Sequence, residues 1–378
     1  MSGRRQSALL VAGLLAGCAL SGVRGRLVEP WPQRLGEWRL FVGRPAELRP
    51  NEGVLPYDVE VALFSDHALK HRTLWMPRGR RAAFRQSGPL EFPVGTVFSK
   101  TFYYFRDEDG VRSSLEDGRP ADGFPGRPED RRLIETRLLV RTETDWVALP
   151  YVWNEEQTEA TLEVAGDEKA LVWRDGDGQA QSFVYLVPNT DQCAGCHETL
   201  TATGRRLRPI GPTARNLNHD YPYPGGQANQ LARWREAGYL DGGSDPAAAP
   251  RWPRAEGAAG GASRARAYLD VQCAHCHGRG GPAGSSGLYL DFEEQAPERL
   301  GICKTPVAAG RGSGGLSYDI VPGRPDESIL FHRMASREPD VMMPEVGRNL
   351  RDEGGLDLVR RWIEDLPGSC GTSTPAGR

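Results

Sequence analysis

Four of the seven cysteines lie in two copies of one pattern, Cys193-Ala194-Gly195-Cys196-His197 and Cys273-Ala274-His275-Cys276-His277. Two thiols separated by two residues and followed at once by a histidine are typical of haem c attachment. The sulfurs add to the porphyrin vinyl groups and the imidazole binds the iron. The pattern therefore predicts two covalently bound haem c groups, with His197 and His277 as the proximal iron ligands.

Two other chemistries use paired cysteines, and each explains less of the pattern. A four-cysteine zinc site would need the two pairs to act together, but they lie 80 residues apart and the repeated histidine would have no role. A thioredoxin-like dithiol needs a βαβ setting, which the sequence around neither motif predicts. Haem attachment accounts for the thiols and for the histidine.

The sequence around the second motif predicts three helices. Apolar residues share one face in Ser263–Gln272, Pro325–Ser336 and Leu356–Leu366. Three helices around a covalently bound haem resemble a class I cytochrome c domain, which takes its second iron ligand from a methionine in the loop before the last helix. Here that loop holds Met342 and Met343.

Of these two, Met343 is the predicted distal ligand of the second haem. The following proline, Pro344, disfavours helical backbone at Met343 and favours an extended conformation. Met342 is the alternative ligand, or else it packs into the core. His332 and Met334 lie on a predicted helix and are weaker candidates. A thioether ligand raises the reduction potential relative to a second imidazole, so this haem is expected to have a comparatively high potential.

The distal ligand of the first haem is left open by the sequence. No methionine occurs between Met76 and Met334. His219, 22 residues after the histidine of the first motif, is the first candidate. His67, His71 and Met76 are the others, and an open iron position is a further alternative.

Before the linker, short β-prone runs alternate with glycine- and aspartate-rich turns, and one short helix is expected near Gln227–Ala237. This pattern predicts an antiparallel β-rich domain, sandwich or barrel, with the first motif near its end. The predicted strands are Asp58–Phe64, Thr96–Phe105, Leu133–Val140, Trp146–Tyr151, Ala160–Val164, Ala170–Trp173 and Ser182–Val187.

The predicted fold is therefore α+β and multidomain. An antiparallel β-rich domain with one haem c motif is followed by an all-α class I cytochrome c-like domain with the other. The linker between them is rich in glycine, proline and alanine. The expected parts are a lipoprotein signal peptide (1–17), an N-terminal tether (18–36), the β-rich domain (37–240), the linker (241–262), the cytochrome c-like domain (263–370) and a tail (371–378).

The three remaining cysteines point to export. Cys18 follows Leu15-Ala16-Gly17, after a positive start at Arg4 and Arg5 and an apolar stretch, an order that resembles a bacterial lipobox. Cleavage before Cys18 and lipidation of its thiol would anchor the chain at a membrane surface; an ordinary signal peptide is the alternative. In an exported protein, Cys303 and Cys370 are expected to form a disulfide that closes a loop of 67 residues, although two buried thiols are the alternative.

Composition and the absence of certain motifs argue against a nucleic-acid-binding protein, a membrane-spanning protein and a hydrolase. The formal net charge of −3 makes a nucleic-acid-binding surface unexpected. After the first twenty residues no apolar run is long enough to cross a bilayer. The 46 glycines and 29 prolines predict extensive loops. Neither a nucleophile elbow nor a zincin motif occurs, so a hydrolase has little support.

Over most of its length the sequence resembles a bacterial family of diheme c-type cytochromes of unassigned physiological role. The family's C-terminal part is similar to cytochrome c, and its N-terminal part carries the first haem motif without being a standard cytochrome domain. The resemblance implies haem c, export and electron transfer, and it supplies no substrate. The matching blocks are Leu63–Asp66, Pro93–Thr96, Glu135–Leu139, Tyr151–Asn154, Asn216–Asn218, Ile320–Gly323 and Met342–Glu345.

The functional hypothesis is an exported diheme c-type cytochrome that passes single electrons between redox partner proteins. It would be a periplasm-facing lipoprotein of the Gram-negative cell envelope, held at the membrane through Cys18, and it would not bind nucleic acid. One alternative is a diheme peroxidase-like oxidoreductase with an open first haem, which needs an acid or base beside the vacant iron position. Another is a docking module for a redox enzyme, which would use small, transient contacts.

Overall fold

The computed structural model describes residues 22–23, 25, 27–113, 127–242, 245–253, 257–308 and 310–371. The predicted signal peptide, the lipidation site Cys18 and the tail beyond residue 371 lie outside the described residues. No helix in the described ranges is long and apolar enough to span a membrane.

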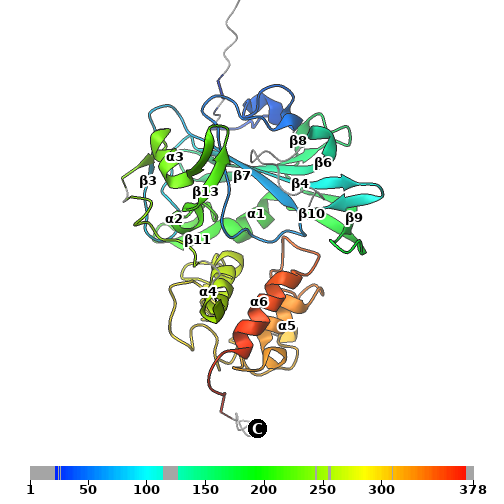
Figure 1. The fold of residues 1–378 in the computed structure, drawn as a ribbon, viewed down its shortest axis with the longest axis vertical. Coiled ribbons are helices and arrows are strands. Elements are labelled where there is room, and N and C mark those ends of the chain that lie inside the picture. Colours follow the sequence, from blue (N-terminus) through cyan, green and yellow to red (C-terminus); the bar gives the residue numbers. More distant parts are fainter. Residues whose placement is uncertain are drawn as a thin grey trace, which may run out of the picture.

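A large curled sheet dominates the β-rich part of the molecule (Figure 1). Its strand order is β10-β9-β5-β4-β6-β7-β8, and β2 pairs with both β1 and β4. The central strands β4 and β6 are buried almost continuously, as expected for strands covered on both faces. The strands of this sheet are β1 (Leu55–Tyr57), β2 (Leu69–Trp75), β4 (Val97–Asp107), β5 (Gly110–Arg112), β6 (Arg131–Arg141), β7 (Trp146–Trp153), β8 (Ala160–Leu162), β9 (Asp167–Arg174) and β10 (Ala180–Val187).

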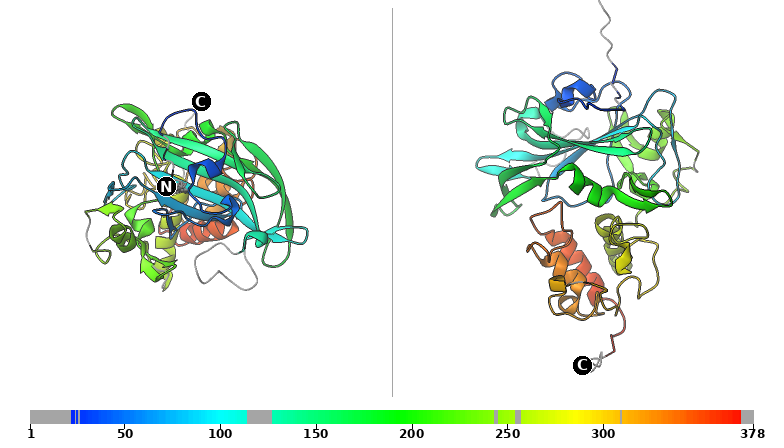
Figure 2. Two further views of the ribbon diagram at one scale, coloured as in Figure 1. Left: turned by 90° about the horizontal axis from the view of Figure 1, so that it is seen from above. Right: turned by 180° about the vertical axis from the view of Figure 1, so that it is seen from behind.

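The two faces of the sheet are covered by different parts of the chain. The N-terminal segment, with short 3-10 helices at Leu35–Trp38 and Pro45–Glu47, covers the upper face in Figure 1. There Trp38 is fully buried, and its indole donates a hydrogen bond to the Tyr151 hydroxyl at 2.7 Å. On the opposite face lie helix α1 (Thr190–His197) and, beyond it, the C-terminal part, as Figure 2 shows from behind.

Smaller elements flank the sheet on the side of α1. Three two-stranded ribbons pair β11 with β12, β13 with β14, and β3 with β15. Helix α2 (Ala214–Leu217) and helix α3 (Gln230–Glu236) pack with them around a buried Trp234. The ribbon strands are β3 (Ala82–Ala83), β11 (Glu198–Thr201), β12 (Gly204–Leu207), β13 (Asp220–Tyr223), β14 (Gly226–Asn229) and β15 (Leu240–Asp241).

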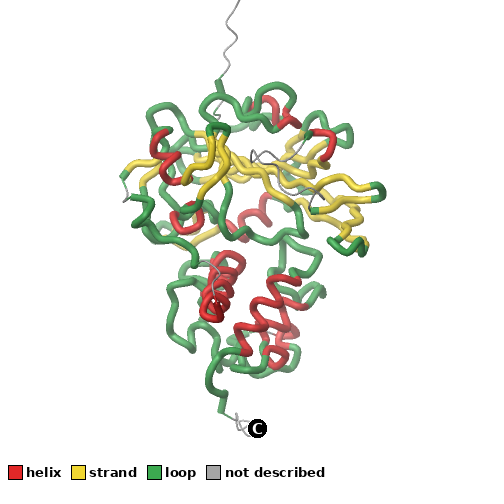
Figure 3. Tube along the Cα trace, viewed as in Figure 1, coloured by secondary structure: helices red, strands yellow, loops and turns green. Residues whose placement is uncertain are grey.

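The C-terminal part is built from three α-helices joined by long loops (Figure 3). They are α4 (Gly257–Leu269), α5 (Ile329–Ala335) and α6 (Glu353–Glu364). Helix α6 packs its apolar face, including Val359 and Trp362, into the core of this part. Gly355 lies directly under the Tyr268 ring of α4, where a Cβ atom would overlap the ring, so glycine permits the close approach of the two helices.

The predicted fold class is wrong in two respects. The sheet is mixed, because β5 pairs with β9 in parallel where an antiparallel sheet was expected. The structure is β-rich, with 28% strand and 22% helix, and the C-terminal part is not an all-α domain. Many glycines interrupt the segment between α4 and α5, and its backbone groups bond in turns, in short 3-10 helices and in two isolated parallel bridges, Ile302 with Ile320 and Tyr318 with Ser328.

Candidate haem-attachment sites

The first Cys-x-x-Cys-His motif occupies the end of helix α1. Asn189 caps this helix by accepting a hydrogen bond from the Gln192 amide at 2.8 Å, and the Gln192 side chain accepts one from the Asn189 amide at 3.0 Å. This reciprocal cap fixes the start of a short helix that has little apolar periodicity of its own. The helix packs against β7 and presents both cysteines and the histidine in its last turn.

The His197 imidazole is held in the orientation of a metal ligand. Its Nδ1 lies 2.7 Å from the backbone oxygen of Arg208, which leaves Nε2 as the nitrogen for a metal. Burial and the nearby Lys100 ammonium lower the pKa of His197 to about 3. The ring is therefore neutral at physiological pH, as metal coordination requires.

The second motif follows helix α4. The α-helix passes into one turn of π-helix at Asp270–Ala274, and such turns often mark functional positions. The backbone amide of His277 donates to the Cys273 oxygen at 2.7 Å, so the motif stays coiled. At Gly281 a Cβ atom would overlap the carbonyl oxygen of Cys276, so only glycine fits where the following loop returns.

The second histidine has a similar environment. The Nδ1 of His277 lies 3.4 Å from the Ser286 hydroxyl oxygen. Burial, followed by the charge of Arg333, lowers the pKa of His277 to about 4. Burial also raises the pKa of the Cys273 thiol to about 12. His277 and Cys273 are neutral, half-buried groups of the types that haem c attachment uses.

The two motifs, far apart in the sequence, lie against each other. The Cys276 sulfur is 3.9 Å from the backbone oxygen of Gly195, inside the first motif. The neighbouring Cys276 thiol also lowers the pKa of the Cys196 thiol below its ordinary value. Just beyond the motifs, the Leu200 amide donates to the Gly280 oxygen at 2.7 Å. The second cysteine of each motif therefore faces the other motif.

Hydrogen bonds between the β-rich part and the C-terminal part hold the two motifs in this arrangement. Gln272, next to Cys273, accepts a hydrogen bond from the Phe64 amide at 2.9 Å and donates one to the Ala62 oxygen at 2.8 Å. Asp66 accepts hydrogen bonds from the backbone amides of Asn349 and Leu350 at 2.6 and 2.7 Å. The predicted linker is packed as well, since Trp252 is buried and donates to the Asn216 side chain at 2.9 Å.

The loop that carries Met342 and Met343 lies between α5 and α6, as predicted. Met342 is buried and Met343 is half-buried. Arg348 fixes the loop from inside, because its Nη2 donates to the Met343 oxygen at 2.8 Å. The charge of Glu345 acts on the Cys276 thiol, which places the loop near the second motif.

Met334 and His332, the weaker candidates for the distal ligand of the second haem, are packed against other parts of the C-terminal part. Met334 is buried in the core of the C-terminal part. His332 packs against Gly314, where a Cβ atom would touch its ring.

The candidates for the distal ligand of the first haem are scattered. Both ring nitrogens of His219 already contact protein groups, Nε2 the Gln230 side chain at 2.8 Å and Nδ1 the Asp220 oxygen at 3.1 Å. His71 is buried on the face of β2 that packs on Phe41, opposite to the face that α1 covers.

The other two candidates are packed among aromatic side chains. Met76 is fully buried in an apolar cluster that includes Trp146 and Trp234. The His67 ring stacks on the Trp173 ring with a centroid distance of 3.9 Å. His67 and its neighbour Asp66 both have positive φ angles, 61° and 50°, at the junction of the two parts.

Cys303 and Cys370 are joined by a disulfide bond. It ties the end of the described chain to the loop before α5 and closes a loop that contains α5, the methionine segment and α6. Among the residues that the structure describes, no group of three or more histidine, cysteine or acidic side chains is arranged to hold a metal ion.

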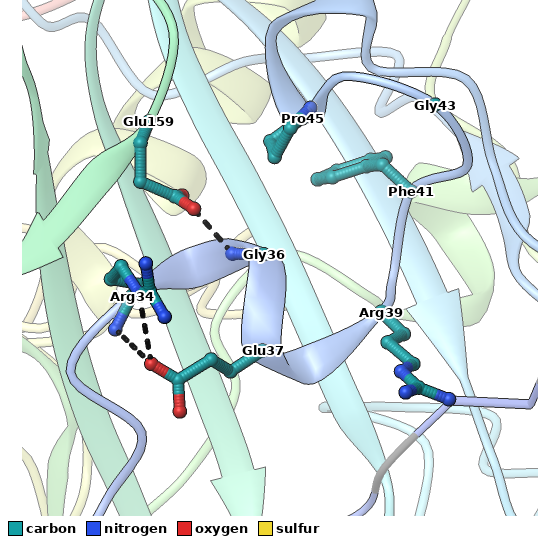
Figure 4. A pocket seen from close by; sticks show the side chains of 8 residues that line it. All are labelled: Arg34, Gly36, Glu37, Arg39, Phe41, Gly43, Pro45 and Glu159. Carbon is teal, nitrogen blue, oxygen red and sulfur yellow. Dashed lines mark hydrogen bonds and ion pairs between the residues drawn. The ribbon is translucent and has the colours of Figure 1, made fainter.

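A surface hollow of about 410 Å³ lies among Arg34, Glu37, Phe41 and Glu159 on the face of the sheet away from α1 (Figure 4). Its charged groups already have partners, since Glu159 accepts from the Gly36 amide and Glu37 pairs with Arg34. A smaller hollow of about 180 Å³ lies beside the second motif and is lined by Asp270, His275 and Asp291, among other residues.

The chain matches no protein-family model, no curated protein and no solved structure. The assignment of a function therefore depends on the residues and the geometry described above.

Proposed function

We propose that this chain is an exported c-type haem protein that transfers single electrons between redox partner proteins. The observation that carries the proposal is the contact between the two Cys-x-x-Cys-His motifs. Two such motifs that meet across a junction of distant chain segments are the arrangement expected when electrons pass from one site to the other. Haem c, when bound, would supply a one-electron iron couple at each motif.

The residues present fit two such groups. Cys193, Cys196 and His197 would hold the first, and Cys273, Cys276 and His277 would hold the second. Each imidazole is half-buried and neutral, and each has its Nδ1 near a protein oxygen, so that Nε2 can bind the iron. Met343 is proposed as the second axial ligand at the second motif.

Export is part of the proposal. The Cys303–Cys370 disulfide supports it, because such bonds persist in oxidising compartments outside the cytoplasm. The lipobox-like sequence before Cys18 supports attachment to a membrane of the cell envelope through a lipid.

Mass spectrometry of the full chain, produced in a bacterial host that attaches haem c, tests the proposal. We expect a mass that exceeds the polypeptide by two haem groups. A Cys193→Ala/Cys196→Ala variant should lose one group, and a Cys273→Ala/Cys276→Ala variant should lose the other. A polypeptide without bound porphyrin, or one that releases all pigment into acidic acetone, would refute the proposal.

One observation favours a second candidate, a peroxidase-like oxidoreductase. His219 already contacts the Gln230 side chain through Nε2, and His71 packs on Phe41, so an open position at the first iron fits the contacts of these two histidines. Carbon monoxide separates the two functions. Binding of this gas to the reduced protein would favour the oxidoreductase, and an unchanged spectrum would favour pure electron transfer.

A further inference from the structure

A row of cations crosses the face of the large sheet that α1 covers. In the register of the sheet Arg72 on β2 lies opposite Lys100 on β4, and Lys100 lies opposite Arg137 on β6. Lys70, two residues before Arg72, is on the same face. We call Lys70, Arg72, Lys100 and Arg137 the cationic band. Like charges directly opposite one another destabilise a sheet, so this band calls for a compensating anion.

The charged ends of three of these side chains converge on one ring. The Phe102 ring centroid lies 4.3 Å from the Arg137 guanidinium carbon, 5.2 Å from the Lys100 ammonium and 5.7 Å from the Lys70 ammonium. Each contact is a cation–π interaction. The band therefore gathers its charge at a single place beside Phe102.

The protein supplies only part of the compensating charge. Asp58 pairs with Arg72. Glu135, fully buried, accepts two hydrogen bonds from Arg137 at 2.7 and 2.5 Å and one from the Tyr185 hydroxyl at 2.7 Å. Within the described part of the chain no carboxylate is hydrogen-bonded to Lys70 or Lys100. With both lysines protonated, four cations against two carboxylates leave an excess of two positive charges. Burial lowers the pKa of Lys100 to about 7 and that of Lys70 well below its ordinary value, so a bound anion would be needed to keep both side chains charged.

The cationic band lies between two apolar regions of the sheet and close to the first motif, which indicates what kind of anion it could bind. On one side of it the same face carries the apolar row Leu74, Phe98 and Leu139, and on the other side an apolar cluster around Tyr104. Helix α1 covers this face and packs on β7, the neighbour of β6, and the charges of Lys100 and Arg137 act on both the Cys193 thiol and the His197 ring. An anion bound here would therefore lie next to the first haem-attachment motif.

We propose that the cationic band binds the two propionate carboxylates of a haem attached at Cys193 and Cys196. This inference rests on the proposed function. Two propionates carry two negative charges, which match the excess on the band, and lysine and arginine are strong charge-assisted donors to carboxylates. A small free anion, such as inorganic phosphate, has related chemistry and is distinguished by experiment.

The test is a redox titration of the full chain with both haems attached, comparing the wild type with Lys100→Gln. Loss of a positive charge beside the propionates stabilises the ferric state, so the reduction potential of one haem should shift downward while the other stays unchanged. Lys70→Gln serves as a second variant should Lys100→Gln fail to mature. Lys169→Gln is the matched control, because Lys169 lies on β9 of the same sheet and pairs with Asp167 at 2.8 Å; it should move neither potential.

Isothermal titration of the same holoprotein with inorganic phosphate completes the test. Binding that disappears in Lys100→Gln would show that the band takes a free anion and would overturn the propionate assignment. Two bound haems whose potentials stay unchanged in both lysine variants would overturn it as well and leave the proposed function intact. Absence of haem from the wild-type mass would instead refute the proposed function.

Discussion

Replacing Arg348 with lysine is expected to release the loop that carries Met343. The guanidinium is buried and makes five hydrogen bonds of 3.2 Å or less to the carbonyl oxygens of Met334, Ser336, Met343 and Leu350, which lysine cannot reproduce together. Arginine reaches these oxygens because its five N–H donors form a fixed planar fork, whereas lysine has three donors on one atom.

The loss of stability in Arg348→Lys follows from the number of hydrogen bonds that the variant loses. Lysine, with three N–H donors, would keep about two or three of the five, and a hydrogen bond from a charged donor contributes about 1.5–3 kcal/mol to stability. We therefore expect the free energy of unfolding to fall by at least about 3 kcal/mol. Because the loss falls on the Met343 loop, the reduction potential of the second haem should fall with it as thioether ligation weakens.

Urea denaturation and a redox titration of the holoprotein measure the two effects. Arg337→Lys is the matched control, because Arg337 lies in the same loop and makes a single exposed hydrogen bond, to the Asn349 oxygen at 3.0 Å. It should change stability by less than about 0.5 kcal/mol. An Arg348→Lys protein with wild-type stability and both potentials unchanged would show that this arginine does not position the loop.

Three further predictions follow from the same structure. Met343→Ala should lower the potential of one haem and leave the other near its original value; a shift in Met342→Ala alone would reassign the ligand. A Cys303→Ser/Cys370→Ser protein should lose up to about 4 kcal/mol of stability in chemical denaturation, because the disulfide closes a loop of 67 residues, and equal stability would argue against this role for the bond. Burial raises the pKa of Asp66 from 3.8 to about 6, so the folded state holds this proton over a pH range in which the unfolded state has lost it. The free energy of unfolding should then fall as pH rises from about 4 to about 6, and Asp66→Asn should lack this component; parallel pH profiles for the two proteins would contradict the assignment.

Six of the seven expected strands correspond to strands of the large sheet, namely β4, β6, β7, β8, β9 and β10, whereas β2 and the shortest strands were not expected. The expected strands Thr96–Phe105 and Leu133–Val140 correspond to β4 and β6 within about two residues at each end. Strand β2 went unpredicted because Lys70 and Arg72 stand on its inward face, where apolar residues would have signalled a strand. The expected strand Asp58–Phe64 is irregular, because its backbone amides donate to side chains of distant segments instead of to a neighbouring strand. The Val61 amide donates to the Asn216 side chain, and the Phe64 amide donates to the Gln272 side chain.

The haem motifs were evident from local spacing, but the groups that position them were not. Arg208 orients His197 through its backbone oxygen, which any residue type provides, so no sequence signal exists for it. The sequence carries no signal for Arg348 either, because its role depends on backbone carbonyl groups that only the fold brings around its buried side chain. The pairing of Asn189 with Gln192, a capping box at the start of α1, is the one signal that could have located the first helix in advance.

The contact between the two motifs constrains how such a protein is made. The enzyme that joins porphyrin to cysteine must reach the thiols of Cys196 and Cys276, and in the folded chain each of these faces the other motif. On the proposed function, both cofactors must therefore be attached while the two parts are still separate. The hydrogen bonds of Gln272 and Asp66 between the two parts would then form after both haems are attached. Docking of the C-terminal part on the β-rich part would therefore be the last step of biogenesis.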